Sequence, residues 1–141
     1  MEKLWSDVDD YLIAQYVQPD DALNRALADS HAAGLPEINV SPAQGKFLHL
    51  LAKMIGAKSI LEIGTLGGYS TIWLARALAP NGKMITLEFD PKHADVAKKN
   101  IARAGVADRV ELKLGRAIDI LPTLAGPFDL IFIDADKTST A

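Results

Sequence analysis

The chain has 141 residues, of which 49% are hydrophobic and 23% are charged, and its formal net charge is −3. This length and composition predict a soluble domain with one core, and the scattered basic residues argue against a nucleic-acid partner. There are no cysteines, which excludes disulfides and thiolate metal sites. No apolar run reaches membrane-spanning length and the first residues do not resemble a signal peptide. We therefore expect a cytoplasmic protein without a membrane partner.

The first third of the chain favours helices. Apolar residues recur at spacings of three and four from residue 5 to residue 16, which predicts a helix that ends before Pro19. Asp20 or Asp21 can cap a second helix, which ends near Gly34. The aromatic side chains of the first helix are expected to pack or to face a partner subunit, and we assign them no chemistry.

A third helix is predicted to begin after Ser41, because serine is a preferred N-cap and Pro42 suits the first helical position. It is expected to end at Gly56. Its apolar face carries Phe47, Leu51 and Met54 or Ile55.

From Lys58 onward, short apolar runs alternate with helical segments. The predicted strands are 59–63, 84–87, 110–114 and 130–133, and the predicted helices are 69–79, 91–104 and 116–124. This alternation is typical of an α/β domain with a doubly wound, mainly parallel sheet and right-handed crossovers. Ligands of such sheets bind beyond the carboxyl ends of the strands, so chemistry-bearing residues are expected there.

Residues 61–70, Leu-Glu-Ile-Gly-Thr-Leu-Gly-Gly-Tyr-Ser, join the first strand to a helix through a glycine-rich turn. Its glycines allow backbone angles and close approach that other residues would block. The turn presents N–H groups at the positive end of a helix, which suits a ligand with a carboxylate and a ribose. It is not the dinucleotide fingerprint, because Leu66 and Tyr69 occupy two of that motif's glycine positions. An ordinary strand-to-helix turn is the alternative interpretation.

Glu88 directly follows the second strand, about 20 residues beyond the glycine turn. A carboxylate there can accept hydrogen bonds from both hydroxyls of a ribose, and a solvated acid is the alternative. After the third strand, Gly115-Arg116-Ala117 leaves room for an adenine ring to lie against the chain. That feature is weak by itself and gains meaning only from its neighbours.

Asp134-Ala135-Asp136-Lys137 follows the apolar fourth strand. Carboxylates at this place can anchor a hard divalent cation such as Mg²⁺. A lysine that is partly desolvated near the cation could serve as a base. A solvated strand end explains the same residues equally well. The three histidines are isolated in the sequence, and we assign them no ligand role.

Taken together, these motifs resemble the cation-dependent O-methyltransferases of the caffeoyl-CoA and catechol type, which use S-adenosylmethionine. The resemblance covers residues 40–137 and rests on Val-Ser-Pro-Ala-Gln-Gly-Lys-Phe-Leu, the glycine turn and Phe-Ile-Asp-Ala-Asp-Lys. It implies a Rossmann-like methyltransferase fold and methyl transfer to a hydroxyl of a catechol-like or caffeoyl-like small molecule. It also implies a homodimer or higher homo-oligomer, with residues 1–40 as an oligomerising and substrate-covering helical segment and residues 41–141 as the cofactor-binding domain.

The resemblance also implies a set of site residues. Asp134 would be a metal ligand and, with Lys137 as the proposed base, a catalytic residue. Val40 would border the cofactor, Glu88 would bind its ribose and Ala117 would lie by its adenine. The full set of implied cofactor-binding residues is Val40, Glu62, Gly64, Thr65, Gly68, Ser70, Glu88, Ala117 and Asp134.

The sequence departs from the family after residue 137. Thr140 stands where the family usually has a tyrosine, and the later strand that ends in Asp-Asn and completes the metal site does not follow. We therefore expect a sheet without its last strands, in which residues 130–133 form an apolar edge strand, and a weak site for Mg²⁺. The alternative function is a catalytically impaired S-adenosylmethionine-binding module. A nicotinamide-dependent oxidoreductase is a third reading, which lacks the required glycine spacing.

Overall fold

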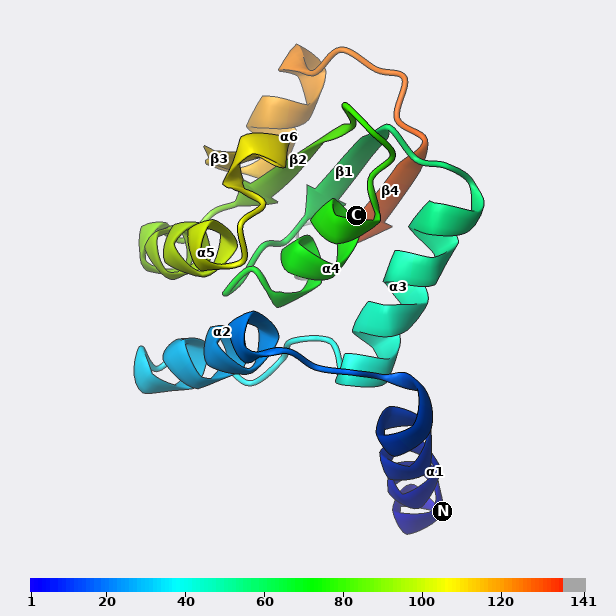
Figure 1. Ribbon diagram of the computed structural model, residues 1–141. Coiled ribbons are helices and arrows are strands. Elements are labelled where there is room, and N and C mark those ends of the chain that lie inside the picture. Colours follow the sequence, from blue (N-terminus) through cyan, green and yellow to red (C-terminus); the bar gives the residue numbers. More distant parts are fainter. Residues whose placement is uncertain (136–141) are drawn as a thin grey trace.

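The computed structural model describes residues 1–135 and contains a four-stranded parallel sheet (Figure 1). The strands are β1 (Ser59–Ile63), β2 (Lys83–Glu88), β3 (Val110–Leu114) and β4 (Leu130–Ile133). Their order in the sheet is β3-β2-β1-β4, so the chain runs outward from β1 to β3 and then returns to the other side of β1. The predicted parallel α/β class is confirmed, and β4 lies at an edge of the sheet formed by residues 1–135.

Three helices connect the strands. They are α4 (Tyr69–Ala77), α5 (Pro91–Arg103) and the short α6 (Ala117–Ile120), and a single 3₁₀ turn, η1 (Ala107–Arg109), precedes β3.

The helix predicted for residues 116–124 is interrupted. α6 ends at Ile120, and residues Leu121–Thr123 form a 3₁₀ turn, η2. The reason is Pro122, which has no N–H to continue the helical ladder and whose ring collides with the preceding turn.

The amino-terminal third forms α1 (Glu2–Tyr16), α2 (Asp21–Ala32) and α3 (Pro42–Met54), close to the predicted ranges. Asp20 caps α2 by accepting a hydrogen bond from the backbone N–H of Leu23. Ser41 and Gln44 form a reciprocal capping box at the start of α3.

The first helix stands apart from the sheet (Figure 1), and none of its residues is buried. Its aromatic side chains are widely exposed, at 63% for Trp5, 62% for Tyr11 and 65% for Tyr16. Within residues 1–135 these rings are therefore not part of the core, and their contact with a partner subunit stays a prediction.

The buried face of α3 differs from the predicted one. Phe47, Met54 and Ile55 are exposed, whereas the buried residues of α3 are Gly45 and Ala52. A Cβ atom at residue 45 would overlap the indole of Trp73 in α4. Helices α3 and α4 therefore approach each other closely at Gly45, which has no side chain. A search for large apolar side chains cannot detect such a contact.

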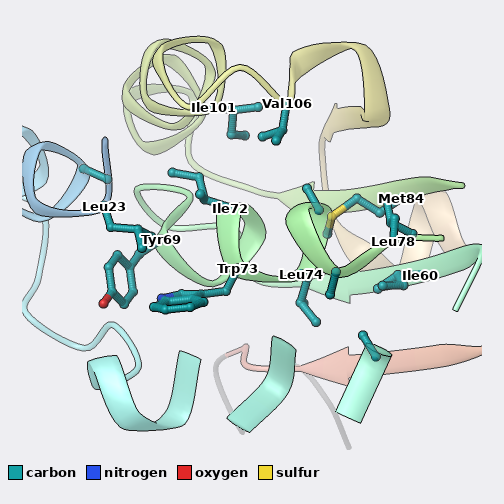
Figure 2. Close-up of a cluster of buried hydrophobic side chains, with 14 of the residues drawn as sticks. Leu23, Ile60, Tyr69, Ile72, Trp73, Leu74, Leu78, Met84, Ile101 and Val106 are labelled. Carbon is teal, nitrogen blue, oxygen red and sulfur yellow. The ribbon is translucent and has the colours of Figure 1, made fainter. Parts of the chain in front are cut away.

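The core lies on both faces of the sheet. One cluster joins strand residues such as Ile60 and Met84 to residues of α2, α3, α4 and α5, with α4 at its centre (Figure 2). The second, smaller cluster joins Leu61, Ile63 and Leu87 to α6 and the segment that follows it. This alternation of faces follows from the period of two along each strand.

Candidate functional site

A cavity of about 1050 Å³ opens beyond the carboxyl ends of β1, β2 and β3. The glycine turn, the end of β2, the turn after β3 and the segment before α3 all contribute to its wall. The predicted residues that line it are Val40, Gly64, Thr65, Ser70, Glu88, Ala117 and Asp134. Glu62 and Gly68 are not among the lining residues, and Lys137 lies outside the described part of the chain.

Backbone geometry explains the glycines of the turn. Gly64 has φ +102° and Gly68, the N-cap of α4, has φ +84°. Both values lie in the left-handed region that favours glycine. A Cβ atom at Gly64 would in addition overlap the main-chain oxygen of Asp134, and one at Gly67 would overlap the hydroxyl of Ser30. The turn is therefore pressed between β4 on one side and α2 on the other.

The carboxylate of Glu88 is held by the backbone at the edge of the cavity. Its Oε2 accepts a hydrogen bond from the N–H of Leu66 at 2.7 Å, and its Oε1 accepts bonds from Phe89 at 2.9 Å and Asp90 at 3.0 Å. A carboxylate offers about four acceptor positions, so one position on Oε2 stays open. With these bonds in place, Glu88 keeps acceptor capacity toward the cavity, and its binding of a ribose stays a prediction.

Glu62 lies behind the cavity wall with no exposed surface. Its Oε1 accepts hydrogen bonds from the hydroxyls of Thr71 at 2.6 Å and Thr86 at 2.8 Å, and its Oε2 accepts one from Ser70 at 3.0 Å. Burial raises the pKa of Glu62 to about 7, and the three hydroxyl donors oppose this rise. The hydroxyl of Thr65 extends the network, because it lies 2.5 Å from that of Thr86.

The other end of the cavity is formed by the turn after β3 and the residue after Glu88. Gly115 turns with φ +147°, and Ala117 begins α6 beside it. Phe89 and Ile118 line the same region while remaining 70% and 65% exposed. An exposed aromatic ring and an exposed aliphatic chain at a cavity mouth offer a surface against which a planar ring can pack.

Phe89, His93 and Ile118 are among the lining residues that sequence reasoning missed. Phe89 could have been found, because it directly follows Glu88. His93 lies one turn into α5, and its ring nitrogens are 3.7 Å from the Glu88 carboxylate and 3.8 Å from that of Asp90. Nothing in the spacing of the histidines signals that position.

The amino-terminal segment covers one side of the cavity through Leu27, Ser30 and residues 38–40. Buried Asn100 of α5 fixes α2 in place, because its Nδ2 donates to the carbonyl of Ala26 at 3.3 Å and to that of Gly67 at 2.9 Å. Two ion pairs also hold α2: Arg103 of α5 pairs with Asp29, and Arg76 of α4 pairs with Asp20.

Asp134 follows β4 and is tied to the sheet by its backbone N–H, which donates to the carbonyl of Ile63 at 2.9 Å. Within residues 1–135, no group of three or more acids and histidines is placed to hold a metal ion. One carboxylate does not make a magnesium site, so the described residues do not fit the implied cation. Among the same residues, no helix combines the length and apolar character that a membrane crossing requires.

A family model described as O-methyltransferase matches residues 18–141. The chain belongs to the O-methyltransferase family. This match includes every segment of the cavity wall, from the cover formed by α2 to the end of β4.

Relatives of this O-methyltransferase chain are found among curated proteins and solved structures. A catechol O-methyltransferase of Mycobacterium tuberculosis is 64% identical over 132 residues, which are 93% of this chain and 60% of that protein. An O-methyltransferase from Bacillus cereus, solved in complex with SAH, is 52% identical with a TM-score of 0.93, covering 97% of this chain and 64% of that one. The O-methyltransferase TomG from Streptomyces achromogenes, involved in tomaymycin synthesis and solved with SAM, is 48% identical with a TM-score of 0.92, covering 98% and 64%.

The O-methyltransferase chain thus spans about three fifths of the length of these relatives. Nearly all of it superposes on their folds, which shows that the Rossmann-like architecture is the methyltransferase one.

Proposed function

We propose that the chain binds S-adenosylmethionine in the cavity and serves methyl transfer to a hydroxyl of a catechol-like or caffeoyl-like small molecule. The observation that carries this proposal is the convergence of the glycine turn, Glu88 and the turn after β3 on one cavity. The relative named catechol O-methyltransferase supports the acceptor class, and the relatives solved with SAH and SAM support the cofactor.

We assign the amino-acid tail of the cofactor to the wall formed by Val40, Gly64, Thr65 and Ser70. This wall lies at the start of α4, where backbone N–H groups and the helix dipole favour a carboxylate. Gly68 contributes through its left-handed backbone, which aims α4 at the cavity, and Glu62 contributes from behind the wall.

We assign the nucleoside to the opposite part of the cavity. The open acceptor position of Glu88 takes a ribose hydroxyl, and Ala117 leaves room for the adenine ring. Phe89 and Ile118 then cover the ring from the mouth of the cavity.

S-adenosylmethionine, when bound, supplies an electrophilic methyl group. The contribution of this chain is to hold the donor in one orientation, so that an acceptor hydroxyl can be aligned with the methyl. Asp134, which lines the cavity after β4, stays the carboxylate proposed for catalysis and as one ligand of a metal site that residues 1–135 do not complete, and Lys137, beyond the described residues, stays the proposed base. A cytoplasmic location is likewise proposed.

Calorimetric titration with S-adenosylhomocysteine tests the cofactor assignment. We expect binding to the wild-type chain and a loss of at least about tenfold in affinity for Glu88→Ala, because a charge-assisted hydrogen bond is lost. Glu111→Ala, which removes an exposed carboxylate from the neighbouring strand, is the matched control and should leave the affinity unchanged. Tight binding of NADH with no binding of S-adenosylhomocysteine would contradict the proposal.

A second candidate function is a binding module that holds the cofactor without turnover. It is favoured by the complete cavity wall combined with the lack of a three-ligand metal group in residues 1–135. A methylation assay with a catechol and Mg²⁺ separates the two candidates. Binding without methylation supports the module, whereas Mg²⁺-dependent turnover by the 141-residue chain supports the enzyme.

We further propose that residues 1–40 serve as a helical segment for oligomerisation and for covering the site. The exposed apolar stripe of α1 is flanked by Asp7 and Asp9, whereas α3 has no acidic residue and carries Lys46 and Lys53 beside its own exposed stripe. Because the two stripes are apolar and their borders have opposite charges, α1 of one copy suits α3 of a second copy. In a homodimer with two such contacts, the α1 stripe and the α3 stripe of each copy would both be buried.

A further inference from the structure

We infer that Glu62 is a positioning residue, which acts on a bound ligand through the hydroxyl of Ser70 and does not itself touch the ligand. The inference rests on the proposed function and concerns the same cavity. Glu62 is completely buried and lies behind the wall, whereas Ser70 is part of the wall.

The hydrogen bonds of Glu62 fix the direction of the Ser70 hydroxyl. At pH 8, above its pKa of about 7, Glu62 is a carboxylate that can only accept, so Ser70 donates its proton to Oε2 across the 3.0 Å contact. The bond therefore selects one rotamer of Ser70 and determines which side of its oxygen faces the cavity. A free hydroxyl would rotate, and a ligand would lose affinity in ordering it.

Glu62 also reaches a second residue of the wall. Its Oε1 accepts the hydroxyl of Thr86, which lies 2.5 Å from the hydroxyl of Thr65. Thr65 lines the cavity next to the glycine turn. Because the hydroxyl of Thr65 also donates to the carbonyl of Leu87 at 3.1 Å, the one wall hydroxyl whose direction Glu62 sets directly is that of Ser70, on the side of the proposed amino-acid tail.

A purely structural role explains a buried carboxylate less well. Removing a carboxylate from water is costly, and an apolar side chain of similar volume often serves stability equally well at such a position. A role in ordering polar wall residues requires an acceptor at this place, which no apolar side chain can supply.

The test compares two ligands that differ only at the tail. S-adenosylhomocysteine has the amino-acid tail, and 5′-methylthioadenosine lacks it. We expect Glu62→Gln and Ser70→Ala each to weaken binding of S-adenosylhomocysteine about tenfold at pH 8, while 5′-methylthioadenosine changes by less than about twofold. The double variant should bind S-adenosylhomocysteine with about the same affinity as whichever single variant binds it more weakly, because both changes remove the same contact.

Thr71→Val is the matched control, since it removes a hydroxyl from the same carboxylate without changing the wall. It should lower the melting temperature and leave both affinities within about twofold. If Glu62→Gln does not fold, Glu62→Asp, which withdraws the carboxylate by one methylene, replaces it with the same expectation.

Equal losses for both ligands, or additive effects in the double variant, would overturn the inference while leaving the proposed function intact. No binding of S-adenosylhomocysteine to the wild-type chain would overturn both. A loss confined to S-adenosylhomocysteine and absent from the control supports the inference.

Discussion

Glu62 makes the stability of the molecule depend on pH in a direction opposite to that of ordinary surface acids. Its pKa is raised from 4.5 to about 7 by burial, so the folded chain holds a proton that the unfolded chain releases. Protonation of Glu62 therefore stabilises the fold fully below pH 4.5, and this stabilisation is lost as the pH rises through about 7.

This sign gives a measurable difference between the wild type and Glu62→Gln. Between pH 5 and pH 8, the wild type should lose about 2–3 kcal/mol of unfolding free energy that the variant, which does not titrate, keeps. Urea unfolding at both pH values measures it. The difference between the two proteins cancels the pH dependence that other groups contribute to both, including that of His49, whose pKa is lowered by burial. Parallel pH profiles for the two proteins would contradict the expectation.

The sequence predicted which residues lie together at the site, but it did not predict their burial or their hydrogen bonds. The carboxyl ends of parallel strands share one edge, so Gly64, Glu88 and Ala117 could be brought together from their positions alone. The burial of Glu62 and the three backbone bonds to Glu88 depend on side-chain directions within the folded turn. No spacing rule contains that information.

Among the elements, the contact between α3 and α4 depends most on a single small residue. Gly45 lies against the indole of Trp73, which is almost fully buried. Gly45→Ala should destabilise the chain by about 1–3 kcal/mol, because the added methyl overpacks the contact and outweighs the gain in helix propensity. Urea unfolding followed by tryptophan fluorescence measures the loss.

A second substitution separates overpacking from a general effect on α3. In a Trp73→Phe background, where the smaller ring leaves room, Gly45→Ala should cost clearly less than in the wild type. An equal cost in both backgrounds would show that the contact with Trp73 is not the reason.

The elements also show where sequence patterns succeed and fail. The caps at Asp20 and Ser41 were predicted well, because each side chain acts on the first turn of the helix that follows it. The helix after β3 was overestimated because of Pro122, and the face of α3 was misjudged because helix packing there uses Gly45 and Ala52. A local period reports which residues share a face, but the partner of that face is decided by tertiary packing.

At the scale of the whole molecule, two apolar surfaces of the described residues are exposed to solvent. The first is the stripe of α1 together with that of α3. Sedimentation velocity should show a dimer for the wild-type chain and a monomer for Trp5→Ser combined with Tyr11→Ser, because the stripe of α1 loses its two large anchors. Persistence of the dimer in this variant would exclude α1 as the contact.

The second surface is the outer edge of the sheet. The opposite edge strand, β3, carries Glu111 and Lys113, and charges of this kind discourage pairing between edges. β4 contains only Leu-Ile-Phe-Ile, and Ile131 and Ile133 are 55% and 56% exposed. In the described sheet, β4 has a neighbour on one side only, β1.

This difference between the edges predicts a second kind of association, in which β4 of one copy pairs with β4 of another. Combined with the α1-dependent dimer, this second self-complementary contact gives assemblies that grow with concentration and have no fixed size. Ile131→Lys should suppress it, because a charge on β4 opposes strand pairing, and should leave the α1-dependent dimer intact. Light scattering over a concentration series measures the open-ended association, and sedimentation velocity measures the dimer. If Ile131→Lys abolished the dimer while the α1 variant preserved it, β4 rather than α1 would be the interface between two copies.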